Sequence, residues 1–133
     1  MDTPRVVVGA AILRTTERGT EVLAAERMAP AALAGGWEFV GGKVDAGETD
    51  VRALIRECRE ELGVDIVVGQ RVGDDTELTG GGAILRVWIC RIESGEPESI
   101  EHSALRWLTA AELYDVAWLP ADLPIVCALH ALL

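Results

Sequence analysis

Hydrophobic residues fall into short runs along the chain, separated by polar or glycine-rich segments. The runs RVVVGAAILR (5 to 14) and EVLAAER (21 to 27) flank the polar stretch TTERGT, which predicts two strands joined by a turn. The segment MAPAALAGG then predicts a loop before the short strand-like WEFV. Further strands are expected near 70 to 78 and 83 to 92, on either side of the turn TGGG, and at 103 to 108.

A helical pattern follows GGKVDAGE, which we expect to be a loop. Thr49 or Asp50 can cap this helix, and Gly63 is placed to end it. A short helix from Thr109 and a final helix over 124 to 133 complete the chain. The apolar stripe expected to face the core from the first helix is Val51, Leu54, Ile55, Cys58 and Leu62. Strands, helix, strands and helix in this order predict a mixed α/β fold without regular βαβ alternation.

Length and composition favour a single domain covering residues 1 to 133. Half of the residues are hydrophobic, and no linker, repeat or charge block divides the chain. No run approaches the roughly 20 apolar residues that cross a membrane. The start MDTPRVVVGA has no basic segment before a long apolar run, so we expect no secretory signal, no membrane partner and a cytoplasmic location.

Charge and cysteine usage exclude some functional classes. The three cysteines, Cys58, Cys90 and Cys127, form no C-x-x-C pair and have no histidine cluster, so we expect reduced core residues and no zinc site. A net charge of -10 argues against binding to a nucleic-acid polymer, which needs basic patches. An anionic small molecule stays possible, because divalent cations held by carboxylates supply local positive charge.

One cluster of charge stands out in RECREELG, residues 56 to 63. Spacings of three and four place Glu57, Glu60 and Glu61 on one helix face, where like charges repel. A solvated surface partly neutralised by neighbouring arginines is one interpretation. A bound cation is the other, and the residues around the cluster decide between them.

Those surroundings resemble a known family. Gly42, five residues, Glu48, seven residues and then the segment from Arg56 to Val64 are similar to the Nudix box, G-x5-E-x7-R-E-U-x-E-E-x-G-U, where U is a bulky aliphatic residue. Cys58 stands at a U position, which is a mild departure. The likeness extends to GGWEFVGGKVDAGE, to Glu101 and to LPADLP, which are similar to MutT-type nucleoside triphosphate pyrophosphohydrolases. Proline is usual where this chain has Val40.

The resemblance implies a metal site with defined ligands. Mg²⁺, with Mn²⁺ as a possible substitute, prefers oxygen ligands. The implied ligands are Glu57, Glu60, Glu61, the carbonyl of Gly41 and the side chain of Glu101. Glu57 is our expected general base and Glu101 is the other candidate. Arg56 and Glu48 are expected to orient the carboxylates rather than to form a simple surface pair.

The resemblance also implies substrate contacts. Arg27 is expected on phosphate, unless it is a solvated arginine at a strand end. Gly42 and Lys43 are expected beside the substrate. We expect the tryptophans to be core residues, with Trp118 as the candidate exception that contacts substrate. Asp122 has two interpretations: a helix N-cap, or a carboxylate that accepts a hydrogen bond from the N4 amino group of cytosine.

The fold implied by the resemblance is a Nudix α/β/α sandwich, with a mixed sheet between helices. The implied reaction converts a nucleoside triphosphate and water to the monophosphate and pyrophosphate. The segments RVGDD and LRWLTAAELYDVAWLPAD most resemble the actinobacterial branch that hydrolyses CTP, dCTP and 5-methyl-dCTP, and in some members 8-oxo-dGTP. Two alternatives are 8-oxo-dGTP as substrate, which would make the protein a sanitiser of the nucleotide pool, and a non-catalytic module that senses a nucleotide. We expect a monomer or a homodimer.

Overall fold

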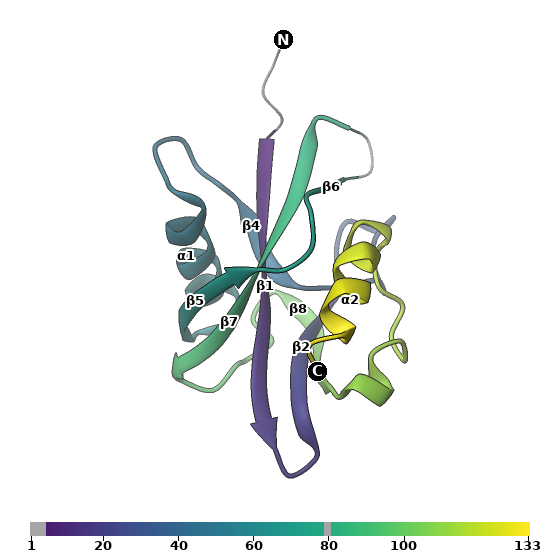
Figure 1. Cartoon of the computed structure of the whole chain (residues 1–133). Coiled ribbons are helices and arrows are strands. Elements are labelled where there is room, and N and C mark those ends of the chain that lie inside the picture. Colours follow the sequence, from purple (N-terminus) through teal and green to yellow (C-terminus); the bar gives the residue numbers. More distant parts are fainter. Residues whose placement is uncertain (1–4, 79–80) are drawn as a thin grey trace.

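Among the described residues, two α-helices lie on opposite sides of a mixed sheet of eight strands (Figure 1). The computed structural model describes residues 5 to 78 and 81 to 133. The strands are β1 (Arg5–Thr16), β2 (Gly19–Arg27), β3 (Trp37–Glu38), β4 (Val40–Lys43), β5 (Asp65–Arg71), β6 (Thr76–Glu77), β7 (Ala83–Ser94) and β8 (His102–Leu108). The helices are α1 (Asp50–Leu62) and α2 (Leu123–His130), with 3₁₀ turns at Ala110–Glu112 and Pro120–Asp122.

Strand β1 organises the sheet because it pairs with three other strands. Its first part runs parallel to β7 and antiparallel to β4, and its last residues form an antiparallel hairpin with β2. Strand β2 then pairs with β3 and β8. The sheet therefore opens into two wings beyond β1, with β4, β5 and β7 on one and β2, β3 and β8 on the other.

Each face of the sheet has its own hydrophobic core. Leu54, Cys58 and Leu62 of α1 pack with buried residues of β1, β2 and β7 in one core. Ile125 and Leu129 of α2 belong to the other core. Figure 1 shows α1 and α2 on opposite sides of the strands. This arrangement confirms the expected α/β/α sandwich with a mixed sheet.

Helix α1 begins and ends at the residues that the sequence predicts. The Thr49 side chain accepts a hydrogen bond from the Arg52 N–H at 3.2 Å, as an N-cap residue should. Gly63 adopts a left-handed conformation with φ 71°, and its N–H donates to the Arg59 carbonyl. The predicted buried stripe is wrong at its start, because Val51 lies in the first turn and is exposed. Ile55 is only partly buried, whereas Ala53 is fully buried.

The strand expected at 70 to 78 is wrong. Strand β5 begins directly after α1 and ends at Arg71, and β6 comprises only Thr76–Glu77. Gly73 separates them with a φ of +68°, where a left-handed residue interrupts an extended strand. In the expected turn TGGG, Gly81 and Gly82 have positive φ, and residues 79 and 80 lie outside the described part of the chain.

The structure also differs from three smaller predictions. Val40–Lys43 forms β4, so the expected loop begins with a strand that pairs with β1. The segment after Thr109 is a 3₁₀ turn, and the final helix is Leu123–His130 rather than 124 to 133. Cys58 and Cys90 are buried as expected, whereas Cys127 is exposed and is not a core residue. Across the described residues, the helices are all too short or too polar to cross a membrane.

Candidate functional site

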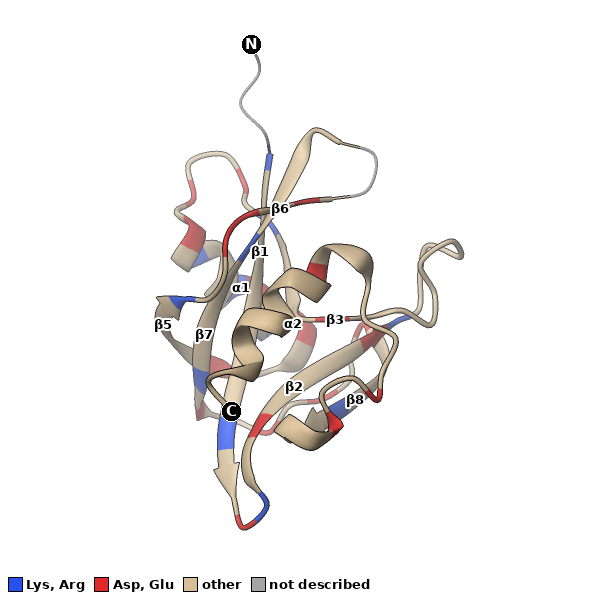
Figure 2. Ribbon diagram, turned by 45° about the vertical axis from the view of Figure 1, so that its right-hand side comes forward, with Lys and Arg blue, Asp and Glu red and all other residues tan. Residues whose placement is uncertain are grey.

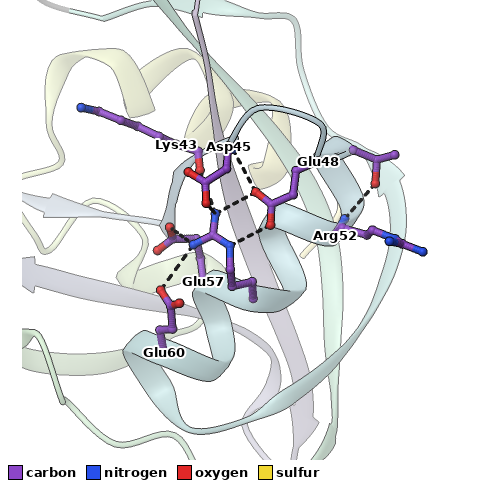
Figure 3. A network of polar contacts seen from close by, with 8 residues as sticks. Lys43, Asp45, Glu48, Arg52, Glu57 and Glu60 are labelled. Atoms are coloured by element: carbon purple, nitrogen blue, oxygen red, sulfur yellow. Dashed lines mark hydrogen bonds and ion pairs between the residues drawn. The ribbon is translucent and has the colours of Figure 1, made fainter.

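Arg56 is the centre of a polar network between α1 and the loop that precedes it. Figure 3 shows this network with Glu48 and Glu57 among its labelled members. Its guanidinium donates to Glu48 through Nε at 2.7 Å and through a terminal nitrogen at 2.9 Å. It also donates to Glu57 at 2.9 Å, to Glu60 at 3.4 Å and to the Lys43 carbonyl at 3.0 Å. Arg56 therefore connects β4, the loop and two turns of α1 in one arrangement.

The same network keeps Glu48 ionised. Hydrogen bonds from Arg56 and from the Asp45 N–H lower the pKa of Glu48 to about 2. The paired hydrogen bonds between the guanidinium and this carboxylate have the bidentate form that is both strong and directional. Arg56 and Glu48 are thus placed to orient the carboxylates beside them, as the resemblance implies.

Glu57 lies directly against the backbone of β4. A methyl group added at Gly42 would lie 2.5 Å from the Glu57 carboxyl carbon, so only glycine leaves room for this carboxylate. Burial raises the pKa of Glu57, and the adjacent Arg56 counteracts part of that rise. At Gly41 an added methyl group would lie 1.8 Å from the Val8 carbonyl oxygen, so glycine is required there as well.

Glu61 is a partly buried carboxylate among other carboxylates. Burial and the charges of Glu57, Glu101 and Glu38 raise the pKa of Glu61 to about 8. Its Oε2 is buried and has no hydrogen-bond partner among the described residues. A buried acceptor without a donor costs free energy, and a cation beside it would remove both that cost and the repulsion.

A divalent cation fits the chemistry of this donor set. Carboxylate oxygens are the hard ligands that Mg²⁺ prefers, and Glu57, Glu61, Glu101 and Gly41 all line one cavity. Glu60 differs, because its side chain is 55% exposed and is paired with Arg56. Among the described residues, no three His, Cys, Asp or Glu side chains are gathered as a ready-made metal site. These residues therefore supply the oxygen ligands that Mg²⁺ prefers, but their side chains are not close enough together to form a preformed metal site.

The cavity has a volume of about 560 Å³ and contains charged and apolar walls. Besides the carboxylates, Arg27, Lys43 and Asp122 line it. The apolar part of its wall consists mainly of aliphatic side chains, among them Val7, Leu78, Leu85 and Leu119. A site with one charged region and one apolar region suits a ligand that carries phosphates and a flat, hydrophobic ring.

Asp122 is nearly buried at this cavity. Its carboxylate accepts a hydrogen bond from the Phe39 N–H at 3.4 Å, and its side chain makes no capping hydrogen bond to α2. The helix-cap interpretation is therefore wrong for the side chain, although the residue stands at the cap position. Burial and the charge of Glu38 raise the pKa of Asp122 to about 7. Figure 2 shows acidic positions on β3 and on the segment that leads into α2.

Arg27 lines the cavity and is already paired. It donates to Glu38 at 3.2 Å and to the Ala29 carbonyl at 3.0 Å. Glu38 also contacts Nε2 of His102 at 3.0 Å. No local sequence pattern marks Glu38 or His102 as a site residue, although Glu38 lies within GGWEFV and His102 follows Glu101 directly.

Trp118 does not reach the cavity. It is buried, its Nε1 donates to the Leu113 carbonyl at 2.7 Å, and its ring lies 4.9 Å from that of Phe39. The other three tryptophans pack against the two cores, as expected. Lys43 lines the cavity, and in Figure 3 its side chain extends away from the Arg56 network. Of the expected substrate contacts, the structure therefore brings Arg27, Gly42, Lys43 and Asp122 together and leaves Trp118 in the core.

Comparison with known proteins gives a consistent result. The model of the NUDIX domain family matches residues 3–129. "Putative 8-oxo-dGTP diphosphatase 2" of Mycobacterium tuberculosis (strain ATCC 25618 / H37Rv) is 51% identical over 121 residues, which cover 89% of this chain and 82% of the relative. "CTP pyrophosphohydrolase" of Escherichia coli (strain K12) is 39% identical over 117 residues, which cover 87% of each chain.

Solved structures show the same fold. The solution structure of the E. coli ORF135 protein has a TM-score of 0.77 and 37% identity, covering 96% of this chain and 89% of that chain. The solution structure of a MutT protein (family Nudix hydrolase) from methicillin-resistant Staphylococcus aureus 252 has a TM-score of 0.75 and 36% identity, covering 98% of each chain. With the complete box from Gly42 to Val64 and these similarities, the chain belongs to the NUDIX domain family and is a Nudix hydrolase.

Proposed function

We propose that this hydrolase is a Mg²⁺-dependent nucleoside triphosphate pyrophosphohydrolase that acts on CTP, dCTP or 5-methyl-dCTP. The products are the nucleoside monophosphate and pyrophosphate. One observation carries the proposal: Glu57, Glu61, Glu101 and Asp122 line the same cavity. The first three suit a cation that binds phosphates, and the fourth offers a hydrogen-bond acceptor to a base. The relative named as a CTP pyrophosphohydrolase supports this substrate class.

Different residues of the protein have different proposed roles in the reaction. When bound, Mg²⁺ would neutralise charge on the phosphate oxygens and make an attacking water more acidic. Glu57 is our proposed general base, because burial raises its pKa and Arg56 fixes its orientation. Glu101 is the second candidate, since it lines the same cavity. Arg56 acts by holding the carboxylates, and Lys43 and Arg27 add positive charge beside the phosphates.

Asp122 is the proposed contact to the base. An ionised carboxylate only accepts hydrogen bonds, which matches the N4 amino group of cytosine. The aliphatic wall formed by Val7, Leu78 and Leu85 offers an apolar surface to the ring. One bidentate or charge-assisted hydrogen bond distinguishes bases by roughly ten- to hundredfold.

A second candidate substrate is 8-oxo-dGTP. The relative that is 51% identical carries this activity in its name. The pKa of Asp122, near 7, is a further reason, because a protonated carboxyl group donates a hydrogen bond to a carbonyl such as O6 of an oxidised guanine. The two substrates therefore select opposite protonation states of the same residue.

A panel of triphosphates tests the proposal. Pyrophosphate release is measured with and without Mg²⁺ from CTP, dCTP, 5-methyl-dCTP, dGTP and 8-oxo-dGTP. We expect release that depends on Mg²⁺ and is fastest for a cytidine nucleotide. Fastest release from 8-oxo-dGTP would select the second candidate. Release of orthophosphate instead of pyrophosphate, or no hydrolysis of any triphosphate, would refute the proposal.

A further inference from the structure

A hydrogen-bond network of three charged or polar side chains connects β2, β3 and β8 at the cavity wall. Arg27 of β2 donates to Oε1 of Glu38 at 3.2 Å, and Nε2 of His102 lies 3.0 Å from Oε2 of the same carboxylate. All three residues line the cavity. Glu38 is therefore held from both sides, with one partner on each oxygen.

The His102 ring is buried and unusually placed for a purely structural residue. Its side chain is 4% exposed, and Nδ1 is buried with no hydrogen-bond partner within the part of the chain that the structure describes. Because a carboxylate only accepts hydrogen bonds, Nε2 carries the proton that bonds to Glu38. His102 pairs with Arg27 across β2 and β8 at a point where the register shifts. The bulge thus places both partners of Glu38 on the same side of the sheet.

Glu38 shares the cavity wall with Glu61 and Asp122. Its charge contributes to raising the pKa of both carboxyl groups. The next residue, Phe39, donates its N–H to Asp122. In any nucleoside triphosphate the sugar lies between the base and the phosphates. With phosphates near Glu61 and a base near Asp122, as the proposed function requires, the sugar lies beside Glu38.

We infer that His102 is a positioning residue that holds the Glu38 carboxylate as the acceptor for a sugar hydroxyl of the nucleotide. Each carboxylate oxygen accepts more than one hydrogen bond, so Glu38 keeps capacity for a hydroxyl after Arg27 and His102 have bonded to it. A carboxylate with two fixed partners has little rotational freedom, and the hydroxyl then meets an acceptor in a defined place. The inference rests on the proposed function and adds a sugar contact to it.

A matched pair of variants separates positioning from packing. His102→Gln keeps an N–H near the Nε2 position, whereas His102→Met has a similar length and volume but no N–H. Ser103→Ala is the control, because Ser103 is an exposed neighbour of His102 and donates a hydrogen bond to Glu26, which contacts neither Glu38 nor His102 in this network. Each protein is assayed with CTP, dCTP and 2′,3′-dideoxy-CTP. Binding of the monophosphates dCMP and 2′,3′-dideoxy-CMP is measured by calorimetry without metal.

We expect the parent to prefer the substrate with the hydroxyl by roughly ten- to hundredfold in kcat/KM. Preference for dCTP over the dideoxy form identifies the 3′-hydroxyl, and preference for CTP over dCTP identifies the 2′-hydroxyl. The preference should persist in the Gln and Ser103 variants and fall below about threefold in His102→Met and in Glu38→Gln. In His102→Met the loss should fall on the substrate that carries the hydroxyl and not on the dideoxy form, which a merely structural role of His102 would not produce.

Three results would overturn the inference. The first is a parent that hydrolyses all three triphosphates without distinguishing their hydroxyls, which leaves the proposed function intact. The second is equal discrimination in the Gln and Met variants of His102. The third is a parent that neither hydrolyses nor binds any of these nucleotides, which would refute the proposed function as well.

Discussion

Replacing Asp122 with asparagine is expected to raise the free energy of unfolding above pH 7 and to change it little near pH 4. Burial raises the pKa of this carboxyl from its ordinary value of 3.8 to about 7 in the folded protein. The folded state therefore holds a proton that the unfolded state releases between these values, so stability falls as the pH rises through this window. Asparagine keeps an oxygen for the Phe39 N–H and removes the titration.

The magnitude follows from the width of that window. Each pH unit corresponds to about 1.4 kcal/mol, so the interval from 3.8 to about 7 gives an upper limit of about 4 kcal/mol. The assay is urea unfolding of both proteins from pH 4 to pH 8, with stability compared at each pH. If the variant and the parent show the same dependence on pH, the carboxyl does not titrate as the structure indicates and the reasoning is wrong.

Glu48 supplies a control of opposite sign. Arg56 lowers its pKa to about 2, so its contribution to stability is present above its ordinary value of 4.5 and is lost as the pH falls through about 2. Glu48→Gln should therefore be less stable than the parent at pH 7, and the gap should close in acid. The same Asp122→Asn protein should shift the ratio of kcat/KM from dCTP toward 8-oxo-dGTP by roughly ten- to hundredfold, because an amide both donates and accepts.

Three further predictions concern the reaction itself. Glu61→Gln should stay folded and lose at least about a hundredfold in Mg²⁺-dependent turnover, and near-normal turnover would exclude Glu61 as a ligand. Hydrolysis in ¹⁸O-water should place the label in pyrophosphate, as expected for attack at the β-phosphorus, and label in the monophosphate would mean attack at the α-phosphorus. Gly42→Ala should displace the Glu57 carboxylate and lower kcat by roughly tenfold or more; an unchanged kcat would show that Glu57 tolerates the displacement.

Local signals in the sequence predict the parts of the fold that depend on neighbouring residues. The caps at Thr49 and Gly63 and the hairpin of β1 and β2 were predicted because each depends on a few adjacent positions. The break between β5 and β6 was missed, because it depends on pairing with β7 and on Gly73 packing beside Ile125 of α2. Such contacts join residues far apart in the sequence.

In the candidate site, too, residues marked by local spacing could be predicted, whereas residues that meet only through the fold could not. The box carboxylates could be predicted because their spacing on one helix is itself the signal. Glu38 and His102 are 64 residues apart and meet only because β3 and β8 both pair with β2. The sequence offers Trp118 as a candidate substrate contact because it directly precedes the segment LPADLP. The direction of its ring depends on Phe39 and on the Leu113 carbonyl, which no local pattern reveals.

The exposure of Cys127 gives the protein a ready attachment point for a spectroscopic label. Cys58 and Cys90 are buried, and burial raises the pKa of both thiols, so they react slowly with maleimides. A fluorophore added to the unmodified chain should therefore attach to Cys127, on α2 and five residues after Asp122. The label would thus be confined to one position on α2 without any engineered cysteine.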